Sequence, residues 1–340
     1  MNIQSAIKAV VAGTNLTLEQ STDVFSEIMS GGATDAQIAA FIVALRMKGE
    51  TADEITGAAS VMREKAIHIL PAKRTNLVDT CGTGGDGANS FNISTAAAFV
   101  AAGAGAVVAK HGNRNISSKC GSADVLEALG VNISIAPEFM EKCLDSIGIA
   151  FLFAPALHKA MKHAIGPRKE IGIRTIFNML GPLTNPALAP NQLMGVYSAD
   201  ITETMAVALK NMGSQKAYIV HGLDPLDEVS ISNSTRVSEI INGNIKTYTV
   251  SPEDFGMTRV PVSAIAGGTP SENAEIIRKI LKGEKGPQRD IVILNSSFAI
   301  AAAGITDSPV EAISIANQSI DSGAALNKLI ELSKATTVID

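Results

Sequence analysis

The feature that most constrains the fold is an alternation that begins at Asn76. From there on, short runs of β-branched and other apolar residues alternate with Ala-rich stretches of helical character. This alternation predicts an α/β sheet, mostly parallel, with helices on its faces. Asn242-Gly243, flanked by two further runs, predicts a β-hairpin. The expected strands cover residues 77–79, 106–109, 151–153, 193–197, 217–220, 235–240 and 246–250.

The first 70 residues predict helices instead. Three capping boxes begin at Thr17, Thr34 and Thr51, each with Gln or Glu three residues later. Apolar residues follow each box at helical spacing, and Pro71 closes the segment. This segment carries no chemical motif of its own, so it predicts a packing or dimerisation module. Residues 166–190 read as a helix and turn inserted between two α/β portions.

Composition excludes several classes of protein. A chain of 340 residues suggests two domains, and 46% hydrophobic with 18% charged residues excludes a disordered protein. A net charge of −5 and only 4% aromatic residues argue against a nucleic-acid binder. The longest apolar run, residues 96–109, is shorter than the roughly 20 residues of a membrane-spanning helix, and the first 20 residues make a poor signal peptide. Three cysteines without a CxxC support neither a disulfide framework nor a zinc site, and predict a cytoplasmic location.

A glycine-rich loop, residues 79–87, follows the first expected strand and precedes a helix expected to begin near 92–95. Glycine amides and a helix N-terminus together favour a phosphate or pyrophosphate. The spacing matches neither the Walker loop nor GxGxxG, and a simple tight turn is the alternative. Asp86 favours a binding role, since an acid inside a phosphate site is unfavourable unless it binds a hydroxyl, a metal or an amine.

A second polar loop, residues 110–124, follows the next expected strand and also precedes a helix. It carries Lys110, Arg114 and Lys119 with several hydroxyl side chains, and we expect these cations to converge on the opening of one binding site. Ligands bind beyond the carboxyl ends of strands in open α/β sheets, so two such loops predict a polyanion site. The alternative is a solvated charged loop.

Two further groups have weaker signals. Asp227-Glu228 follows the strand expected at 217–220. Alone, the pair is typical of exposed surface carboxylates, but opposite a phosphate-binding loop it is suited to hold Mg²⁺. A basic run reads as an exposed helix face, although Arg168 is well suited to pair with a carboxylate. That run comprises Lys159, Lys162, His163, Arg168, Lys169 and Arg174. His158 and His163, five residues apart, do not have the spacing of zinc ligands on a helix, and we interpret Cys81 as a packing residue.

Taken together, these motifs resemble those of the anthranilate phosphoribosyltransferase family. The resemblance rests on Gly82-Thr-Gly-Gly-Asp86, Asn92-Ile-Ser-Thr95, Lys110-His-Gly-Asn-Arg114, Ser117-Ser118, Gly121-Ser-Ala-Asp124, Gly181-Pro-Leu-Thr-Asn-Pro186 and Asp227-Glu228. Pyrimidine nucleoside phosphorylases share the wider fold, but their basic loop resembles KHGGR, so Asn113 favours the anthranilate enzyme. Cys120 is a departure, because many relatives carry Ser there.

The resemblance implies a transferase of tryptophan biosynthesis. Anthranilate and 5-phosphoribosyl 1-diphosphate would give N-(5-phosphoribosyl)anthranilate and pyrophosphate, with Mg²⁺. It implies a small discontinuous helical domain, residues 1–70 with 166–190 returning to it, and a larger α/β domain, residues 71–165 and 191–340. It also implies a homodimer through the helical domain and a site in the cleft between the domains. The alternatives are a nucleoside phosphorylase and a non-catalytic relative that binds nucleic acid; Asp227-Glu228 and the net acidity argue against the second.

The resemblance also implies roles for individual residues. Phosphoribosyl diphosphate would bind Gly82, Gly85, Asp86, Ser90, Asn92, Ile93, Ser94, Thr95, Lys110, His111, Gly112, Asn113, Arg114, Asn115, Ile116, Ser117, Ser118 and Ser122. Ser94, Asp227 and Glu228 would hold Mg²⁺. Anthranilate would contact Gly82, Asn113 and Arg168, with His111 nearby. Lys110, His111, Asn113 and Arg168 are the expected catalytic residues.

Overall fold

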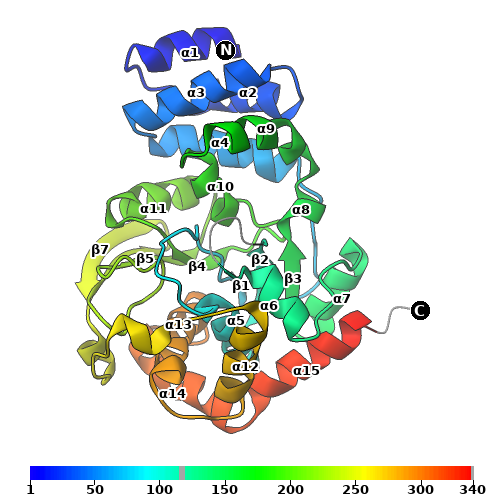
Figure 1. Cartoon of the computed structure of the whole chain (residues 1–340), viewed down its shortest axis with the longest axis vertical. Helices are drawn as coiled ribbons and strands as arrows, with labels where there is room; N and C mark the ends of the chain where they lie inside the picture. The colour runs from blue at the N-terminus through cyan, green and yellow to red at the C-terminus, as the bar shows by residue number, and fades with distance from the viewer. Residues whose placement is uncertain (115–118, 338–340) are drawn as a thin grey trace.

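A computed structural model describes residues 1–114 and 119–337 of the chain. It confirms the predicted fold class: a helical N-terminal part stands above a larger α/β part, with the N-terminus at the helical end and the last helix at the opposite end (Figure 1). Among the described residues, no helix is both long and apolar enough to cross a membrane.

The helical part begins with α1 (Ile3–Val11), α2 (Leu18–Met29), α3 (Asp35–Lys48) and α4 (Ala52–Glu64). The three predicted capping boxes form, at Thr17, Thr34 and Thr51, and fix where α2, α3 and α4 begin. The apolar residues at helical spacing are buried, and Phe25 packs edge-on against Phe41 with ring centroids 5.8 Å apart. The sequence pattern of this part therefore predicted its helices and its core.

Helices α9 (Lys162–Ile171) and α10 (Phe177–Leu183) lie far along the chain but pack on these first helices. Helix α9 contacts α2 and α3, and α10 contacts α4. Phe177 inserts against Phe25, with ring centroids 5.8 Å apart. The chain thus passes from the sheet to the helical part and back again, while the predicted division at 70, 166 and 190 stays a prediction.

The large part is built on one seven-stranded sheet in the order β3-β2-β1-β4-β5-β6-β7. The pairs from β3 to β5 are parallel, and β6 and β7 are antiparallel additions at one edge. The predicted hairpin forms, with Asn242 and Gly243 both at positive φ. The strands are β1 (Leu77–Asp79), β2 (Val107–Gly112), β3 (Ile149–Phe153), β4 (Asn191–Gly195), β5 (Lys216–Gly222), β6 (Thr235–Ile241) and β7 (Asn244–Val250).

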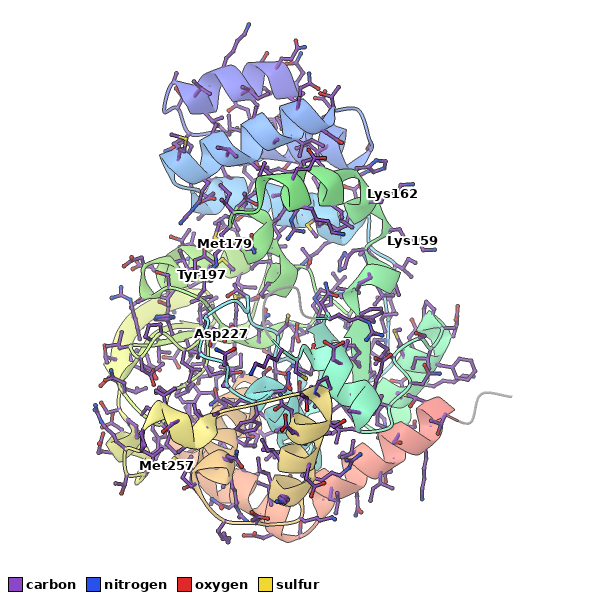
Figure 2. All side chains as sticks on the ribbon, viewed as in Figure 1. Lys159, Lys162, Met179, Tyr197, Asp227 and Met257 are labelled. Carbon is purple, nitrogen blue, oxygen red and sulfur yellow. The ribbon has the colours of Figure 1, made fainter. Side chains whose placement is uncertain are left out.

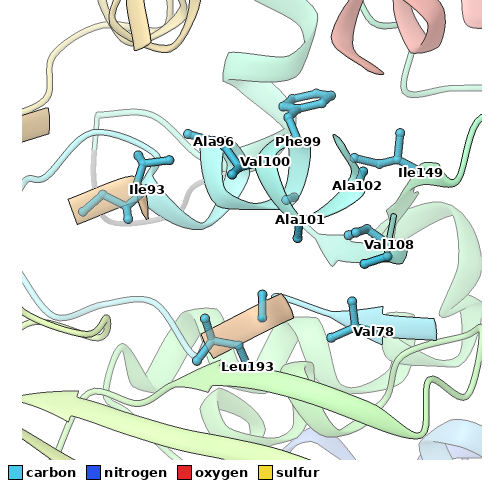
Figure 3. Packing of buried hydrophobic residues seen from close by; sticks show 14 of the residues in the cluster. Val78, Ile93, Ala96, Phe99, Val100, Ala101, Ala102, Val108, Ile149 and Leu193 are labelled. Atoms are coloured by element: carbon cyan, nitrogen blue, oxygen red, sulfur yellow. The ribbon is translucent and has the colours of Figure 1, made fainter. Parts of the chain in front are cut away.

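Helices α5 (Ile93–Gly103) and α13 (Pro287–Ala302) form the centre of the core on one face of the sheet. Both are apolar and buried almost all round, as expected for helices enclosed by other elements. Figure 3 shows α5 packed above Val78, Val108 and Leu193 of the sheet. The other helices are α6 (Ser122–Ala128), α7 (Pro137–Ser146), α8 (Ala154–Leu157), α11 (Thr202–Asn211), α12 (Pro270–Leu281), α14 (Pro309–Asp321) and α15 (Ala324–Thr337), with short 3₁₀ turns at Lys159–Met161, Ala199–Ile201, Pro252–Phe255 and Val262–Ile265.

A second buried cluster joins the helical part to the opposite face of the sheet. It contains residues of α1 to α4, α9, α10 and α11, together with Met194 of β4 and Ile219 of β5. The helical part is therefore anchored to the sheet through α10 and α11, and the carboxyl ends of the strands face the junction between the two parts (Figure 1).

Candidate active site

The candidate site lies where the carboxyl ends of β1 and β4 meet. These strands are neighbours, but the chain leaves β1 for β2 and β3 on one side and continues through β4 and β5 on the other. Such a switch point is where open α/β sheets bind ligands. The glycine-rich loop follows β1, and Asp227-Glu228 follows β5, so topology brings both predicted motifs to this edge.

The glycine-rich loop is shaped by backbone that only glycine adopts readily. Gly84, Gly85 and Gly87 have φ of 66°, 77° and 79°. The loop is tied to β4, because the N–H of Thr83 donates to the carbonyl of Gly195 at 2.8 Å. A Cβ on Gly82 would lie 2.9 Å from that same oxygen, so a side chain there would push the loop away.

At the end of the loop, α5 begins without a side-chain cap. The side chain of Asn92, the N-cap residue, instead donates to the carbonyl of Cys120 at 3.2 Å and accepts from the side-chain amide of Asn273 at 2.9 Å. The N–H of Ser94 donates to Oε1 of Glu228 at 3.1 Å. The N-terminus of α5 therefore points at an acidic side chain, as predicted for an anion-binding helix end.

Three carboxylates gather beside this helix end. The N–H of Asp227 donates to Oδ2 of Asp86 at 3.3 Å, which places the loop acid next to the acidic pair. Burial, then the charge of Asp86, raises the pKa of Asp227 to about 7, and burial with the charge of Asp227 raises the pKa of Glu228. Three crowded acids favour a bound proton or a bound cation. Figure 2 places Asp227 at the centre of the molecule, below the helical part.

The donor set fits Mg²⁺ held partly by a ligand. Carboxylates are its preferred protein ligands, and it commonly takes one or two of them with phosphate oxygens and water. The oxygens of Asp86, Asp227 and Glu228 do not all lie within 4.8 Å of one another in the described structure, so together they do not form a closed protein cage. An ion shared with a diphosphate is consistent with this spacing.

Lys110 corrects one expectation. We predicted it in a loop, but β2 continues through Gly112, so Lys110 lies inside the strand and is 3% exposed. Its Nζ lies 3.3 Å from the hydroxyls of Thr80 and Ser94 and faces the acidic pair. Burial lowers the pKa of Lys110, while Asp227 and Glu228 act in the opposite direction. The result is a buried lysine beneath the helix end.

His111 points to the other face of the sheet, since successive side chains in a strand alternate. The backbone N–H of His111 donates to Oδ1 of Asp79 at 3.1 Å, and the ring Nδ1 lies 3.1 Å from the carbonyl oxygen of Gly181. Its Nε2 is 3.2 Å from Nε2 of His158. Burial lowers the pKa of His111 to about 3 and that of His158 to about 4, so both rings are neutral at pH 7.

Sequence reasoning missed the roles of His158 and Asp79 in this group. One signal was present: His158 follows β3, the neighbour of β2, so both histidines come from adjacent strand ends. Among the described residues, Asp79, Cys81 and His111 form the group whose ligand atoms lie within 4.8 Å. Both ring nitrogens of His111 already have partners, and burial keeps the thiol of Cys81 protonated by raising its pKa. We therefore assign no metal to this group.

Arg168 lies on α9, in the helical part. It is half-buried and lies over the ring of Phe177, with 5.1 Å from Cζ to the centroid. Within the described chain it has no carboxylate ion pair, and burial lowers its pKa. A half-buried guanidinium without a carboxylate is open to an acidic ligand.

Arg114 is engaged by acids on α6 in the described structure, and its expected convergence with Lys110 and Lys119 on one ligand stays a prediction. Its guanidinium pairs with Asp124 at 2.9 Å and with Glu127 at 2.6 Å on α6. Of the other predicted residues, Ser122 caps this loop by donating to the carbonyl of Asn113 at 3.2 Å. Asn115, Ile116, Ser117 and Ser118 lie outside the described residues.

Comparison with known proteins identifies the family. A family model described as the helical bundle domain of a glycosyl transferase family matches residues 4–66, and its α/β domain matches residues 74–326. Anthranilate phosphoribosyltransferase of Moorella thermoacetica is 55% identical over 327 residues, which cover 96% of both chains. The enzyme of Geobacter sulfurreducens is 52% identical over 343 residues, covering 97% of this chain and 98% of that one.

Solved structures agree. The anthranilate phosphoribosyltransferase of Thermus thermophilus superposes with a TM-score of 0.93 at 41% identity, covering 98% of this chain and 99% of that one. The Saccharomyces cerevisiae enzyme, solved with PRPP and Mg, gives 0.90 at 29% identity, covering 99% and 98%. The chain therefore belongs to the anthranilate phosphoribosyltransferase family.

Proposed function

We propose that the chain transfers the phosphoribosyl group of 5-phosphoribosyl 1-diphosphate to the amine of anthranilate, releasing pyrophosphate, in L-tryptophan biosynthesis. One observation carries the proposal: a helix N-terminus, a buried lysine and a carboxylate cluster meet at one strand edge. Those groups together suit a magnesium diphosphate. High identity to curated anthranilate phosphoribosyltransferases over 96% of the chain supports the same activity.

For the diphosphate, we propose the glycine-rich loop, the first turn of α5 and Lys110. Negative charge grows on the departing pyrophosphate, and amide groups and a fixed cation already aimed at that charge lower the barrier. Lys110 is suited to this role because its position is fixed by Thr80 and Ser94. The remaining proposed contacts are Gly82, Gly85, Asp86, Ser90, Asn92, Ile93, Thr95, Gly112, Arg114 and Ser122.

For the metal, we propose Ser94, Asp227 and Glu228, with Asp86 adjacent. Bound Mg²⁺ would neutralise charge on the leaving group. The yeast relative solved with PRPP and Mg supports this assignment. In the free protein Asp227 and Glu228 carry raised pKa values, which fits residues that bind a cation.

For anthranilate, we propose Arg168 as the partner of its carboxylate, with Gly82, Asn113 and the His111 ring beside it. A yeast relative solved with 4-fluoroanthranilate supports an aromatic acid site in this fold. The amine of anthranilate is weakly basic and unprotonated at neutral pH, so no strong general base is required. The neutral ring of His111 accordingly orients the acceptor, anthranilate, and takes no proton from it. Much of the rate enhancement comes from holding the amine of anthranilate in line with C1 of the ribose.

The test is direct. Anthranilate, the diphosphate and Mg²⁺ are mixed with the protein, and loss of anthranilate fluorescence is followed, with chelator as control. The second candidate, a pyrimidine nucleoside phosphorylase, is measured beside it as phosphorolysis of thymidine. Turnover of thymidine without turnover of anthranilate would overturn the proposal.

We also propose a homodimer through the helical part. Apolar side chains of α1, α3 and α9 are exposed there, including Val11, Met47 and Ile165.

A cytoplasmic location stays a prediction from the cysteine content.

A further inference from the structure

Arg174 lies outside the proposed substrate contacts, yet it connects three parts of the site. It belongs to the segment between α9 and α10, six residues after Arg168. Its guanidinium lies over the ring of Tyr197, with 4.7 Å from Cζ to the centroid, and its Nη2 donates to the carbonyl of Gly85. Tyr197 follows β4 at the boundary between the helical part and the sheet (Figure 2).

The contact falls on the middle of the glycine-rich loop. At one end, Thr83 is held twice, by its own N–H on Gly195 and by its hydroxyl, which accepts from the N–H of Tyr197 at 3.1 Å. At the other end, Asp86 accepts from Ala88 at 3.0 Å and from Asp227 at 3.3 Å. Between these ends, the backbone of Gly84 accepts from the hydroxyl of Thr83 at 3.3 Å and bonds the carboxylate of Asp227, while Gly85 has no side chain with which to hold itself.

Arg174 supplies a restraint on Gly85. A Cβ placed on Gly85 would lie 3.4 Å from Nη2 of Arg174, so the guanidinium packs directly on this turn. The planar group donates to a carbonyl along its edge while its face rests on an aromatic ring, a geometry that Lys does not reproduce. Stacking on Tyr197, whose backbone also anchors Thr83, ties both restraints to the end of β4.

We propose that Arg174 is a positioning residue for the transferase reaction. It fixes the Gly84–Gly85 turn and thereby sets the direction in which Asp86 faces Asp227 and Glu228. This inference rests on the proposed function, since it assigns the turn to the diphosphate and its metal. It also links the segment that follows α9, the helix of Arg168, to the loop proposed for the other substrate.

Three variants test the proposal by steady-state kinetics. Arg174→Gln removes the charge, Arg174→Lys keeps it without the planar fork, and Tyr197→Leu removes the ring and leaves Arg174 intact. We expect each to lower kcat/KM for the diphosphate by about tenfold, the scale of one charge-assisted hydrogen bond. The KM for anthranilate should stay within twofold, and the Mg²⁺ concentration for half-maximal rate should rise, because Asp86 adjoins Gly85.

The controls separate this role from others. Lys169→Ala removes an exposed cation five residues away and should behave as wild type. If Arg174 instead bound a phosphate directly, Lys would restore most of the activity and Tyr197→Leu would have no effect, and either result would overturn the proposal. Diphosphate-induced stabilisation in a thermal melt supplies a readout besides turnover, and it should shrink in all three variants.

Two failures remain distinguishable. A wild-type protein that does not consume anthranilate contradicts the proposed function. An active wild type whose Arg174→Gln variant matches it in diphosphate kinetics and in Mg²⁺ dependence contradicts only the positioning role.

Discussion

Asp227 and Glu228 carry carboxylates where burial and mutual repulsion oppose their charge. A carboxyl whose pKa is raised by folding stabilises the fold while it is protonated, and this contribution is lost as pH rises through the folded pKa. The reference pKa of Asp is about 3.9, and that of Asp227 in the fold is about 7. The metal-free protein should therefore lose stability between about pH 4 and pH 7.

The double variant Asp227→Asn with Glu228→Gln should flatten this dependence. At pH 8, without metal, its melting temperature should equal or exceed that of wild type, because the repulsion is gone. With the diphosphate present the order should reverse, and added Mg²⁺ should rescue turnover only partly. Melts from pH 5 to 8 check the first point; Asp79, whose pKa is raised to about 6, is present in both proteins and cancels. A melt lowered by many degrees at pH 8 would mean that the pair is structural.

Arg168→Ala should weaken anthranilate far more than the diphosphate. Arg168 has no carboxylate partner in the described chain, so its removal leaves no buried acid unpaired in the free protein. The bound acceptor would lose a charge-assisted pair of about 2–4 kcal/mol. Separate KM values for the two substrates, with Arg168→Lys as the matched charge control, provide the check. Equal rises in both KM values would contradict the assignment.

At this scale, the chain order of motifs was more informative than any single side chain. Asp86 and Asp227 could be placed at one edge because their loops follow β1 and β5, the two strands that flank β4 in the sheet. The partners of Arg114 could not be predicted, since Asp124 and Glu127 compete for it with any phosphate. His158 was missed because its contact with His111 depends on two separate strand ends, which spacing along the chain does not show.

Helices and strands were predicted correctly where contacts between residues close in sequence determine them. The capping boxes at Thr17, Thr34 and Thr51 start helices by hydrogen bonds within four residues, so the sequence alone contains the cause. The end of β2 was predicted three residues too early. Lys110 and His111 are polar, but the neighbouring β3 pairs with both, and tertiary pairing outweighs their polarity.

Helix α5 provides a prediction at the scale of elements. Gly103, in its last turn, lies against α14 and α15, and a Cβ there would come within 2.3 Å of Ser319 Oγ and 2.6 Å of the backbone nitrogen of Ala325. Gly103→Ala should therefore destabilise the protein by about 1–3 kcal/mol through overpacking. Urea unfolding measures this change.

Gly166→Ala is the matched control for that experiment. Gly166 lies inside α9, and its Cβ would meet only Asp35 Oδ2, at an ordinary 3.6 Å. The substitution should be neutral or stabilising by up to about 1 kcal/mol, because Ala favours helix over Gly. If Gly103→Ala were as harmless as this control, the close packing of α5 on α15 would not determine the identity of residue 103.

For the whole molecule, the arrangement of two hydrophobic clusters follows from the chain path. One cluster encloses α5 and α13, and the other joins the helical part to the opposite sheet face through α10 and α11. The groups proposed for the diphosphate and the Arg168 proposed for anthranilate belong to elements from the two sides of this junction. We therefore expect the reaction to depend on how the two parts are held, which makes contacts of the helical part relevant to activity.

The exposed side chains of the helical part provide the last prediction. Met47 at the end of α3 is 83% exposed and Val11 at the end of α1 is 70% exposed, and α1 packs on α3. Exposed apolar surface that is contiguous is typical of surfaces that meet a partner, and on the proposed dimer these two side chains belong to such a surface. We expect light scattering to give twice the chain mass for the wild type, and the double variant Val11→Glu with Met47→Glu to shift toward one chain mass.

Val310→Glu on α14, which replaces a valine that is 56% exposed at the far end of the molecule, should stay dimeric. A wild type of one chain mass would contradict the dimer, and a dimeric double variant would place the interface away from α1 and α3.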